Sequence, residues 1–407
     1  MVNILQDREE PFSRIFTPER SLMNDTIIIR NGTVHDAINP KATVKDILIS
    51  NGKISRIGKK LSAPSGASVI DASGLQVWPG LVEAHCHIGM SPFGTRDLSD
   101  YNEYTDAVTP QLEAIDGIDP QNPYFLLAAQ AGVTCVATGP GSSNVLGGTF
   151  AAIKTVGLRV DNMVVRRRIG MKCAFGENPK FSYRDKCITS RMTTAAKLRE
   201  FLAKAQDYLA RKNAAGKSVS KRPSYDMKLE ALIPVLQGEI PLKAHAHRAD
   251  DIFTAIRIAK EFNVKMTLEH CTDGHLIADE LAKEGYPLAV GPSWMSVSKP
   301  EVRNKTFATP GILAKAGCKV SIITDSSVVP QDTLALMAGL AIKAGMEPFA
   351  ALQSITINPA RHIGVEDRVG SIEVGKDADI ILSKESIFTL DSGIVTVLIN
   401  GQPVPLA

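Results

Sequence analysis

The chain has 407 residues, of which 44% are hydrophobic and 22% are charged. These values are ordinary for a globular protein, and a chain of this length can bury a large core without disulfide bonds. The formal net charge of +3 is small for the length, so the composition gives no reason to expect nucleic acid or a membrane surface as a partner.

The N-terminal sequence and the cysteines favour a cytoplasmic protein. Residues 1–16 carry charges at short intervals and contain no apolar core of a secretory signal. No apolar run approaches the ~18 residues that a membrane span needs. The six cysteines form no CxxC pair, so we interpret them as free thiols in a reducing compartment.

Both ends of the chain show a sequence pattern of short β-strands separated by tight turns. Residues 1–24 are polar and show no clear period, which predicts an N-terminal arm. From Thr26 the sequence consists of short β-branched segments broken by turns such as Asn51-Gly52, and the far end repeats this pattern. We therefore predict one small β-sandwich domain built from residues 25–79 and 365–407.

The middle of the chain, residues 80–364, alternates short apolar runs with amphipathic stretches. GVTCVATG, GMKCAFG, PLKAHAH, VKMTLEH, PLAVGP and KVSIITD are typical of buried parallel strands. Segments such as DDIFTAIRIAKEF have helical periodicity between them. Repeated strand–helix units over this length predict an α/β fold, a (β/α)₈ TIM-type barrel. A doubly wound sheet is the alternative, but the first strand is followed by no dinucleotide-binding glycine fingerprint.

Five of the eight histidines fall at the carboxyl ends of predicted barrel strands, where barrel enzymes build their active sites. His85 and His87 lie two residues apart in GLVEAHCHIG, and residues two apart on a strand point to the same side. Both rings could therefore reach one point in the barrel mouth, as a chelating pair must, and imidazole is a good ligand for zinc and iron. Taken alone, this short motif is equally consistent with two packed core histidines.

Two later strands end in histidine and a third ends in aspartate. In PLKAHAHRADD we assign the deeper His245 to a metal and His247 to the substrate or to the support of a ligand, with a surface histidine as the alternative. His270 ends VKMTLEH, and Asp325 ends KVSIITDS. A carboxylate that closes a hydrophobic strand is unfavourable without a partner. In isolation Asp325 would be interpreted as a helix N-cap, but the histidines upstream favour a metal ligand.

In this order, the HxH pair after PGLVEA, the two later histidines and the aspartate resemble the amidohydrolase superfamily over nearly the whole chain. VIDASGLQVWPGLVEAHCH and VGSIEVGKDADIIL are similar to the segments that lead into the barrel and into the C-terminal β-sandwich part. The strand motifs and SITINPARHIG resemble imidazolonepropionase-like hydrolases and metal-dependent Xaa-dipeptidases. The resemblance implies a mononuclear or dinuclear metal site and hydrolysis of a C–N bond.

The resemblance also implies a role for the fourth strand, since relatives with two metals often bridge them with a carboxylated lysine. Lys172 in GMKCAFGENPK stands at that place, and Glu177 could take the ligand role instead. An inward lysine in an apolar strand is costly if it is charged and without a partner. If neither is a ligand, one metal is held by His85, His87, His245 and Asp325. His270 would then lie behind the ligands, and Lys172 would contact the substrate or transition state.

Further residues could contact the substrate. Arg191 and Arg248 are candidates for binding a carboxylate, because guanidinium can bind it bidentately; for each alone, a surface arginine is the alternative. Glu103 could line the pocket after the first strand. The loop at residues 139–148, GPGSSNVLGG, lacks the GK[ST] of a phosphate loop and is expected at the rim of the site.

Together these patterns predict an amidohydrolase that cleaves an amide or cyclic amide bond of a small molecule. A metal would activate water and polarise the scissile group, Asp325 would act as general base, and His270 would bind a second metal or stabilise the oxyanion. We expect one or two divalent metals per chain, zinc first and iron or manganese as alternatives, and a homo-oligomer. The alternatives are a deaminase of an amino-substituted ring, a dipeptidase or N-acyl amino acid hydrolase, a metal-free scaffold, and a carboxylate-binding protein.

Overall fold

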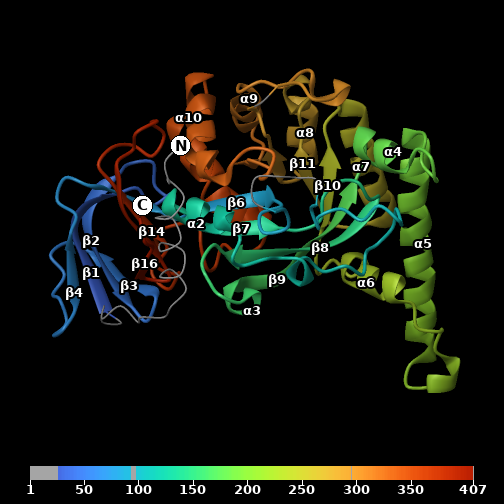
Figure 1. Cartoon of the computed structure of the whole chain (residues 1–407), viewed down its shortest axis with the longest axis horizontal. Helices are drawn as coiled ribbons and strands as arrows, with labels where there is room; N and C mark the ends of the chain where they lie inside the picture. Colours follow the sequence, from blue (N-terminus) through green and yellow to red (C-terminus); the bar gives the residue numbers. More distant parts are fainter. Residues whose placement is uncertain (1–25, 93–97, 295, 407) are drawn as a thin grey trace, which may run out of the picture.

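The computed structural model describes residues 26–92, 98–294 and 296–406, so the arm predicted over residues 1–24 lies outside the described residues. The described chain contains two eight-stranded sheets and a set of helices around one of them (Figure 1). Among the helices described, none combines the length and the apolar character that crossing a bilayer would take.

The first sheet is the predicted barrel. Its strands follow one another in chain order, from β6 to β13. The backbone N–H of His87 donates to the carbonyl oxygen of Ser326 at 2.5 Å, which brings the end of the last strand against the end of the first. The strands are β6 (Leu81–Cys86), β7 (Val133–Thr138), β8 (Leu146–Lys154), β9 (Val164–Ala174), β10 (Leu242–Ala246), β11 (Met266–His270), β12 (Leu288–Val290) and β13 (Val320–Ile322).

One barrel strand runs against the others. β8 pairs antiparallel with both β7 and β9, whereas the other neighbouring strands pair in parallel. Antiparallel neighbours can be joined by a short loop, while parallel neighbours need a crossover segment. Residues 139–145 are therefore a short connection between β7 and β8, and the last residues of the predicted rim loop already belong to β8.

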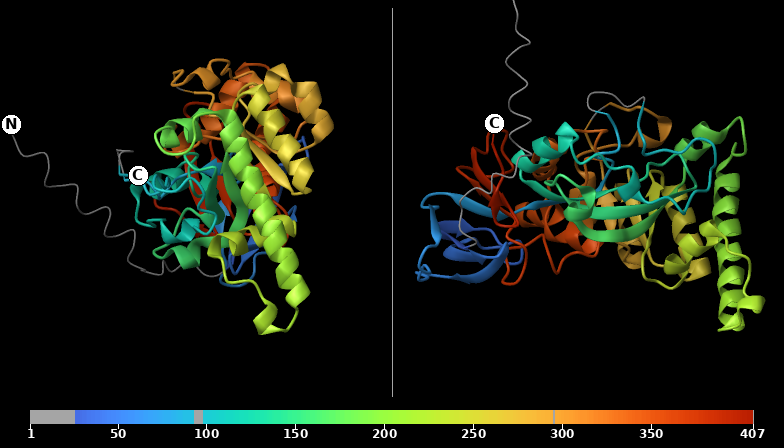
Figure 2. Two further views of the ribbon diagram at one scale, coloured as in Figure 1. Left: turned by 90° about the vertical axis from the view of Figure 1, so that its right-hand side faces the viewer. Right: turned by 60° about the horizontal axis from the view of Figure 1, so that its bottom comes forward.

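Helices cover the outside of the barrel. α5 begins after Ser190, whose side chain accepts a hydrogen bond from Thr193 N, and it extends along the end of the molecule opposite the second sheet (Figure 2). The α-helices are α2 (Pro123–Gln130), α3 (Val160–Met163), α4 (Glu177–Tyr183), α5 (Arg191–Ala215), α6 (Met227–Leu236), α7 (Ala249–Phe262), α8 (Ala278–Glu284), α9 (Thr309–Lys315), α10 (Leu334–Lys343), α11 (Pro348–Ser354) and α12 (Ile357–His362). Short 3₁₀ turns are η1 (Ala114–Asp116), η2 (Val219–Lys221), η3 (Gly274–Leu276), η4 (Pro300–Val302) and η5 (Gln331–Thr333).

The second sheet is built from both ends of the chain. Its order is β16-β15-β14-β5-β1-β2-β3, with β4 beside β1, and the antiparallel pair of β5 and β14 joins the two ends. Asn51-Gly52 and Asn400-Gly401 all have positive φ, as their turns require. The strands are β1 (Thr26–Val34), β2 (Thr43–Ser50), β3 (Lys53–Gly58), β4 (Ser68–Asp71), β5 (Gln76–Pro79), β14 (Ile380–Ser383), β15 (Ile394–Ile399) and β16 (Gln402–Pro403).

Candidate active site

The HxH pair stands at the end of β6 and faces Asp325. The side chain of His85 is fully buried, and that of His87 nearly so. The Nε2 atoms of His85 and His87 lie 3.7 and 3.3 Å from Oδ1 of Asp325. The other ring nitrogen of His87 donates to the carbonyl oxygen of Gly139 at 2.7 Å. This arrangement leaves Nε2 as the atom directed at the carboxylate.

Three further histidines gather beside this group, at the ends of β10 and β11. The ring of His245 lies 4.7 Å from that of His247 and 4.3 Å from that of His270, centroid to centroid. Nδ1 of His247 bonds to the hydroxyl of Thr272, and Nδ1 of His270 donates to the carbonyl oxygen of Gly291, each at 2.8 Å. Burial holds the pKa of all three histidines below the ordinary value, and lowers that of His270 to about 4. Neutral imidazole is the form that binds metals.

These side chains form two neighbouring groups that could each hold a metal ion: His85, His87 and Asp325 in the first, and His245, His247 and His270 in the second. Within each group the ligand-type atoms all lie within 4.8 Å of one another. The rings of His85 and His270, one from each group, have centroids 5.2 Å apart. Both nitrogens of His245 and Oδ1 of Asp325 are buried and have no hydrogen-bond partner among the described residues. Buried polar atoms normally have partners, so the donor set fits a bound cation.

The backbone turns two of these side chains toward the mouth. His270 has φ +77° and Asp325 has φ +54°, a conformation that residues with side chains seldom adopt. The preceding residues, Glu269 and Thr324, instead point into the barrel, where Glu269 meets His85 and Thr324 bonds to Glu83. At the ends of β11 and β13, two consecutive side chains thus face the barrel interior. The regular alternation of side chains along a strand would turn one of the two outward. Such departures collect at functional sites.

Lys172 reaches the same site from β9. Its side chain is fully buried, and its Nζ donates to Nε2 of His85 at 3.1 Å. Burial is the main reason why the pKa of Lys172 falls to about 8. The amine therefore exists partly as the free base near neutral pH, the form that reacts with carbon dioxide.

Beneath the metal-type ligands lies a buried ionic group that the sequence analysis did not identify. Glu269 contacts Nδ1 of His85 at 3.1 Å, Nζ of Lys243 at 3.0 Å and Nε2 of His362 at 3.1 Å. Burial alone would raise the pKa of Glu269, but Lys243 and His362 outweigh it and hold the pKa well below the ordinary value. The sequence could have indicated one member of this ionic group. Lys243 lies two residues before His245, so the two side chains share one face of β10.

A second buried carboxyl group closes the interior of the barrel. Glu83, two residues before His85, accepts hydrogen bonds from Thr324 and from the side chain of Gln331. Burial raises the pKa of Glu83 to about 8 despite these hydrogen bonds. Glu83 is therefore mainly protonated near neutral pH.

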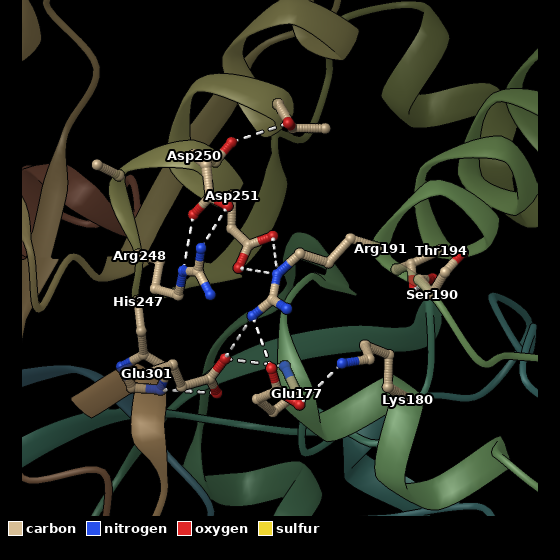
Figure 3. A network of polar contacts seen from close by, with 12 residues as sticks. Glu177, Lys180, Ser190, Arg191, Thr194, His247, Arg248, Asp250, Asp251 and Glu301 are labelled. Atoms are coloured by element: carbon tan, nitrogen blue, oxygen red, sulfur yellow. Dashed lines mark hydrogen bonds and ion pairs between the residues drawn. The ribbon is translucent and has the colours of Figure 1, made fainter. Parts of the chain in front are cut away.

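Glu177, Arg191 and Arg248, which were also predicted as site residues, belong to a network of polar contacts (Figure 3). Glu177 belongs to neither metal-type group and instead pairs with Lys180 at 3.0 Å and with Arg191 at 2.8 Å. Arg191 also contacts Asp251 at 3.0 Å.

Arg248 and Glu103 are likewise engaged with their own chain. Arg248 holds Asp250 through two hydrogen bonds of 2.9 and 2.8 Å. The carboxylate of Glu103 accepts hydrogen bonds from the backbone and the hydroxyl of Thr105, both at 2.7 Å.

Comparison with known proteins shows which family the chain belongs to. A crystal structure of an amidohydrolase from Thermotoga maritima is 38% identical and superposes with a TM-score of 0.90 over 94% of this chain and 100% of that chain. Amidohydrolase tasK from Hapsidospora irregularis is 29% identical and covers 88% of this chain but 39% of its own length. Adenine deaminase 1 from Latilactobacillus sakei is 22% identical and covers 98% of this chain and 61% of its own length.

The chain thus spans less than two thirds of the length of these two curated relatives. The amidohydrolase family profile matches residues 77–404, which include the whole barrel and the second part of the small sheet domain. The match covers most of the chain and confirms the family predicted from the histidine and aspartate pattern. The chain belongs to the amidohydrolase family.

Proposed function

We propose that the protein is a metal-dependent hydrolase that cleaves the C–N bond of an amide or cyclic amide in a small molecule. The observation that carries this proposal is the pair of adjoining metal-type groups at the carboxyl ends of the barrel strands, with a buried lysine against one of them. That end of a barrel is where its enzymes carry out their chemistry.

His85, His87 and Asp325 would hold one metal ion, and His245 and His270 would hold a second, with His247 as the third donor or as a substrate contact. Lys172, once carboxylated, would bridge the two ions, because its amine already stands against His85. Glu177 is the weaker candidate for the bridge, since Arg191 and Lys180 already neutralise its carboxylate. Zinc suits this set of imidazole and carboxylate donors.

A metal bound here would supply a water molecule that is acidic near neutral pH, and would polarise the scissile carbonyl. Asp325 would accept the proton of the attacking water and deliver it to the leaving nitrogen. Burial opposes ionisation of Asp325, but the facing histidines, His270 and His87, outweigh it and lower the pKa, so the carboxylate is ionised at neutral pH. His270 would act as a ligand of the second ion and not as a donor to the carbonyl oxygen, because its neutral ring already donates its one N–H from Nδ1 to Gly291.

The first test is metal content per chain, by elemental analysis of protein purified without chelators. We expect about two zinc ions in the native protein and one or none in Lys172→Ala, with Lys315→Ala, a change at an exposed position on α9, matching the native protein. One metal that survives Lys172→Ala would favour a mononuclear site and remove the bridging role. Absence of metal from all three proteins would contradict the proposed function.

Asp325→Asn tests the general base. Asparagine keeps the shape of the side chain but cannot accept the water proton, so turnover should fall by a factor of about 10² to 10⁴ while the thermal midpoint stays near that of the native protein. Turnover is measured on any amide that a substrate screen identifies. Near-native activity of Asp325→Asn would show that another group takes the proton.

Deamination of an amino-substituted ring is the second candidate, because adenine deaminase 1 from Latilactobacillus sakei is similar over 98% of this chain. The same metal-activated water would attack a ring carbon and release ammonia. An ammonia assay across a panel of aminopurines and aminopyrimidines separates the two candidates, since hydrolysis of a simple amide between carbon groups releases an amine or amino acid instead.

A further inference from the structure

The charged residues around the mouth of the site largely neutralise one another. Arg191 faces Glu177 and Asp251, and Arg248 faces Asp250 (Figure 3). Both guanidinium groups thus have carboxylate partners within the protein. A substrate carboxylate would have to displace these partners, which makes the two arginines poor sites for it.

Lys299 is also satisfied within the protein. Its ammonium group lies 2.7 Å from Oε1 of the fully buried Glu301 and donates to Oδ1 of Asn178 at 2.8 Å. Glu301 in turn accepts a hydrogen bond from the backbone N–H of Glu177 at 2.8 Å. Lys299 therefore serves to neutralise a buried carboxylate at the rim.

Lys305 is the exception. Among the described residues its ammonium group has no carboxylate within ion-pair distance, and its hydrogen bond goes to the carbonyl oxygen of Trp294 at 3.4 Å. Lys305 is half-buried in the segment between β12 and α9. It lines the same small, partly open depression as His270, Ser293 and Thr306.

The surroundings of Lys305 favour an anion. Partial burial, together with the neighbouring charge of Lys299, lowers the pKa of Lys305 below its ordinary value, and Asp325 opposes this effect. A cation that has lost part of its hydration and has no ion-pair partner is stabilised when an anion binds beside it. The depression thus offers a positive charge and the hydroxyl side chains of Ser293 and Thr306, among others, next to a proposed metal ligand.

We propose that Lys305 binds a carboxylate of the substrate, so that the enzyme acts on amides that carry a carboxylate close to the scissile bond, as N-acyl amino acids and dipeptides do. This inference rests on the proposed function of the same site. It transfers to Lys305 the role that the sequence suggested for Arg191 and Arg248. It also favours acyl amino acids over uncharged amino-substituted rings as substrates.

A binding measurement on the metal-loaded protein tests this without turnover. The probe is 4-oxopentanoate, in which a methylene group replaces the amide nitrogen of N-acetylglycine, so no scissile C–N bond is present. The comparison ligand is its uncharged methyl ester. Calorimetry should show that the native protein prefers the carboxylate by at least about tenfold, the size expected of a charged hydrogen bond.

The preference should vanish in Lys305→Met, persist in part in Lys305→Arg, and be unchanged in Lys315→Met, which removes an exposed lysine at the end of α9. Thermal midpoints and metal content check that all three variants are folded and loaded. No preference in the native protein, or a preference that survives Lys305→Met, would overturn the proposal. Because the probe is not hydrolysed, a failure of the proposed function would be seen separately, as absent metal or absent amide cleavage.

Discussion

Among the proposed histidine ligands, His85, His87 and His270 each have one ring nitrogen fixed by a protein group, and the nature of that group differs from one ring to the next. His87 and His270 donate to backbone carbonyl oxygens, whereas His85 faces the carboxylate of Glu269. A carboxylate on the far nitrogen orients the ring and makes the near nitrogen a better donor to a metal. Glu269 also neutralises Lys243 on the neighbouring strand. It therefore both supports the site and holds the charge balance of the barrel interior.

Glu269→Gln should weaken metal binding by a factor of about 10 to 100, because the amide keeps the shape but removes the charge behind His85. Metal affinity is measured by competition with a chelator of known strength. The change also removes the carboxylate that neutralises the buried ammonium group of Lys243, so a lower thermal midpoint of the metal-free protein is expected.

Two comparisons separate the effect on the metal from the effect on the fold. Glu239→Gln, a change at an exposed position, should alter neither quantity. His362→Gln loosens Glu269 from another side but leaves its charge behind His85, so it should lower the thermal midpoint more than the metal affinity. Native metal affinity in Glu269→Gln would show that the carboxylate serves the fold alone.

For single residues, the sequence predicted site positions where metal-binding side chains also had the two-residue spacing that places them on one face of a strand. The HxH pair of His85 and His87 could be placed on one face from spacing alone, and the structure brings it against Asp325. Glu269 was missed because it precedes His270, and alternation would turn one of the two outward. Only the positive φ of His270 lets both face the interior, and no sequence pattern predicts that conformation for a histidine.

At the scale of elements, the barrel could be predicted but the direction of one strand could not. The segment LGGTFAAIK of β8 has two glycines and no clear alternation, so it was not recognised as a strand. Its pairing is a tertiary property, since an antiparallel β8 depends on the chain returning directly after β7. Gly148 has φ +110°, and a Cβ there would lie 2.4 Å from the carbonyl oxygen of Leu112, which explains why glycine stands at this position.

Arg191 joins several elements at the rim, and this predicts a structural effect. It is the first residue of α5 and contacts Glu177 on α4 and Asp251 on α7, and it lies 3.8 Å from Glu301 in η4. The side chains of Asp251 and Glu301 are almost fully buried. Arg191→Met would leave buried carboxylates short of a cation, so we expect a loss of about 3 kcal/mol in unfolding free energy, measured by urea denaturation.

The matched control is Arg199→Met, which breaks a more exposed ion pair between α5 and Glu261 and should cost at most about 1 kcal/mol. Affinity for 4-oxopentanoate should change little in either variant. A stable Arg191→Met protein that loses this affinity would restore Arg191 as the carboxylate-binding residue.

At the scale of the whole molecule, a buried ionic network ties the small sheet domain to the barrel. Lys154 at the end of β8 contacts Asp377 at 3.1 Å and Asp379 at 2.6 Å, just before β14. Asp377 also accepts hydrogen bonds from Arg368 and from Lys53, which begins β3. These residues explain the GKDAD segment that carried part of the family resemblance: its two aspartates bind cations from both domains. The sequence identified the segment, but the partner Lys154 lies more than two hundred positions away and could not be inferred.

The network predicts a pH dependence of stability. Burial alone would raise the pKa of Asp377, but Arg368 and Lys154 outweigh it and lower the pKa to about 2, below the ordinary value of 3.8. A carboxyl group whose pKa is lowered by folding stabilises the folded state above its unfolded pKa and loses this effect as the pH falls toward its folded pKa. The contribution should therefore be complete above about pH 5 and should decline between about pH 4 and pH 2, with a size of about 2 kcal/mol.

Urea denaturation of the metal-free protein and of Asp377→Asn at several pH values measures this contribution. The native protein should be more stable than the variant at pH 6. The difference should shrink steadily below pH 4, because protonation then neutralises the carboxylate of Asp377, whereas the amide of the variant does not titrate. Asp185→Asn, a change at a carboxylate whose side chain is 87% exposed, should show no comparable difference at any pH. A stability difference for Asp377→Asn that is the same at pH 6 and pH 2.5 would mean that the contacts of Asp377, rather than its charge, hold the small sheet domain to the barrel.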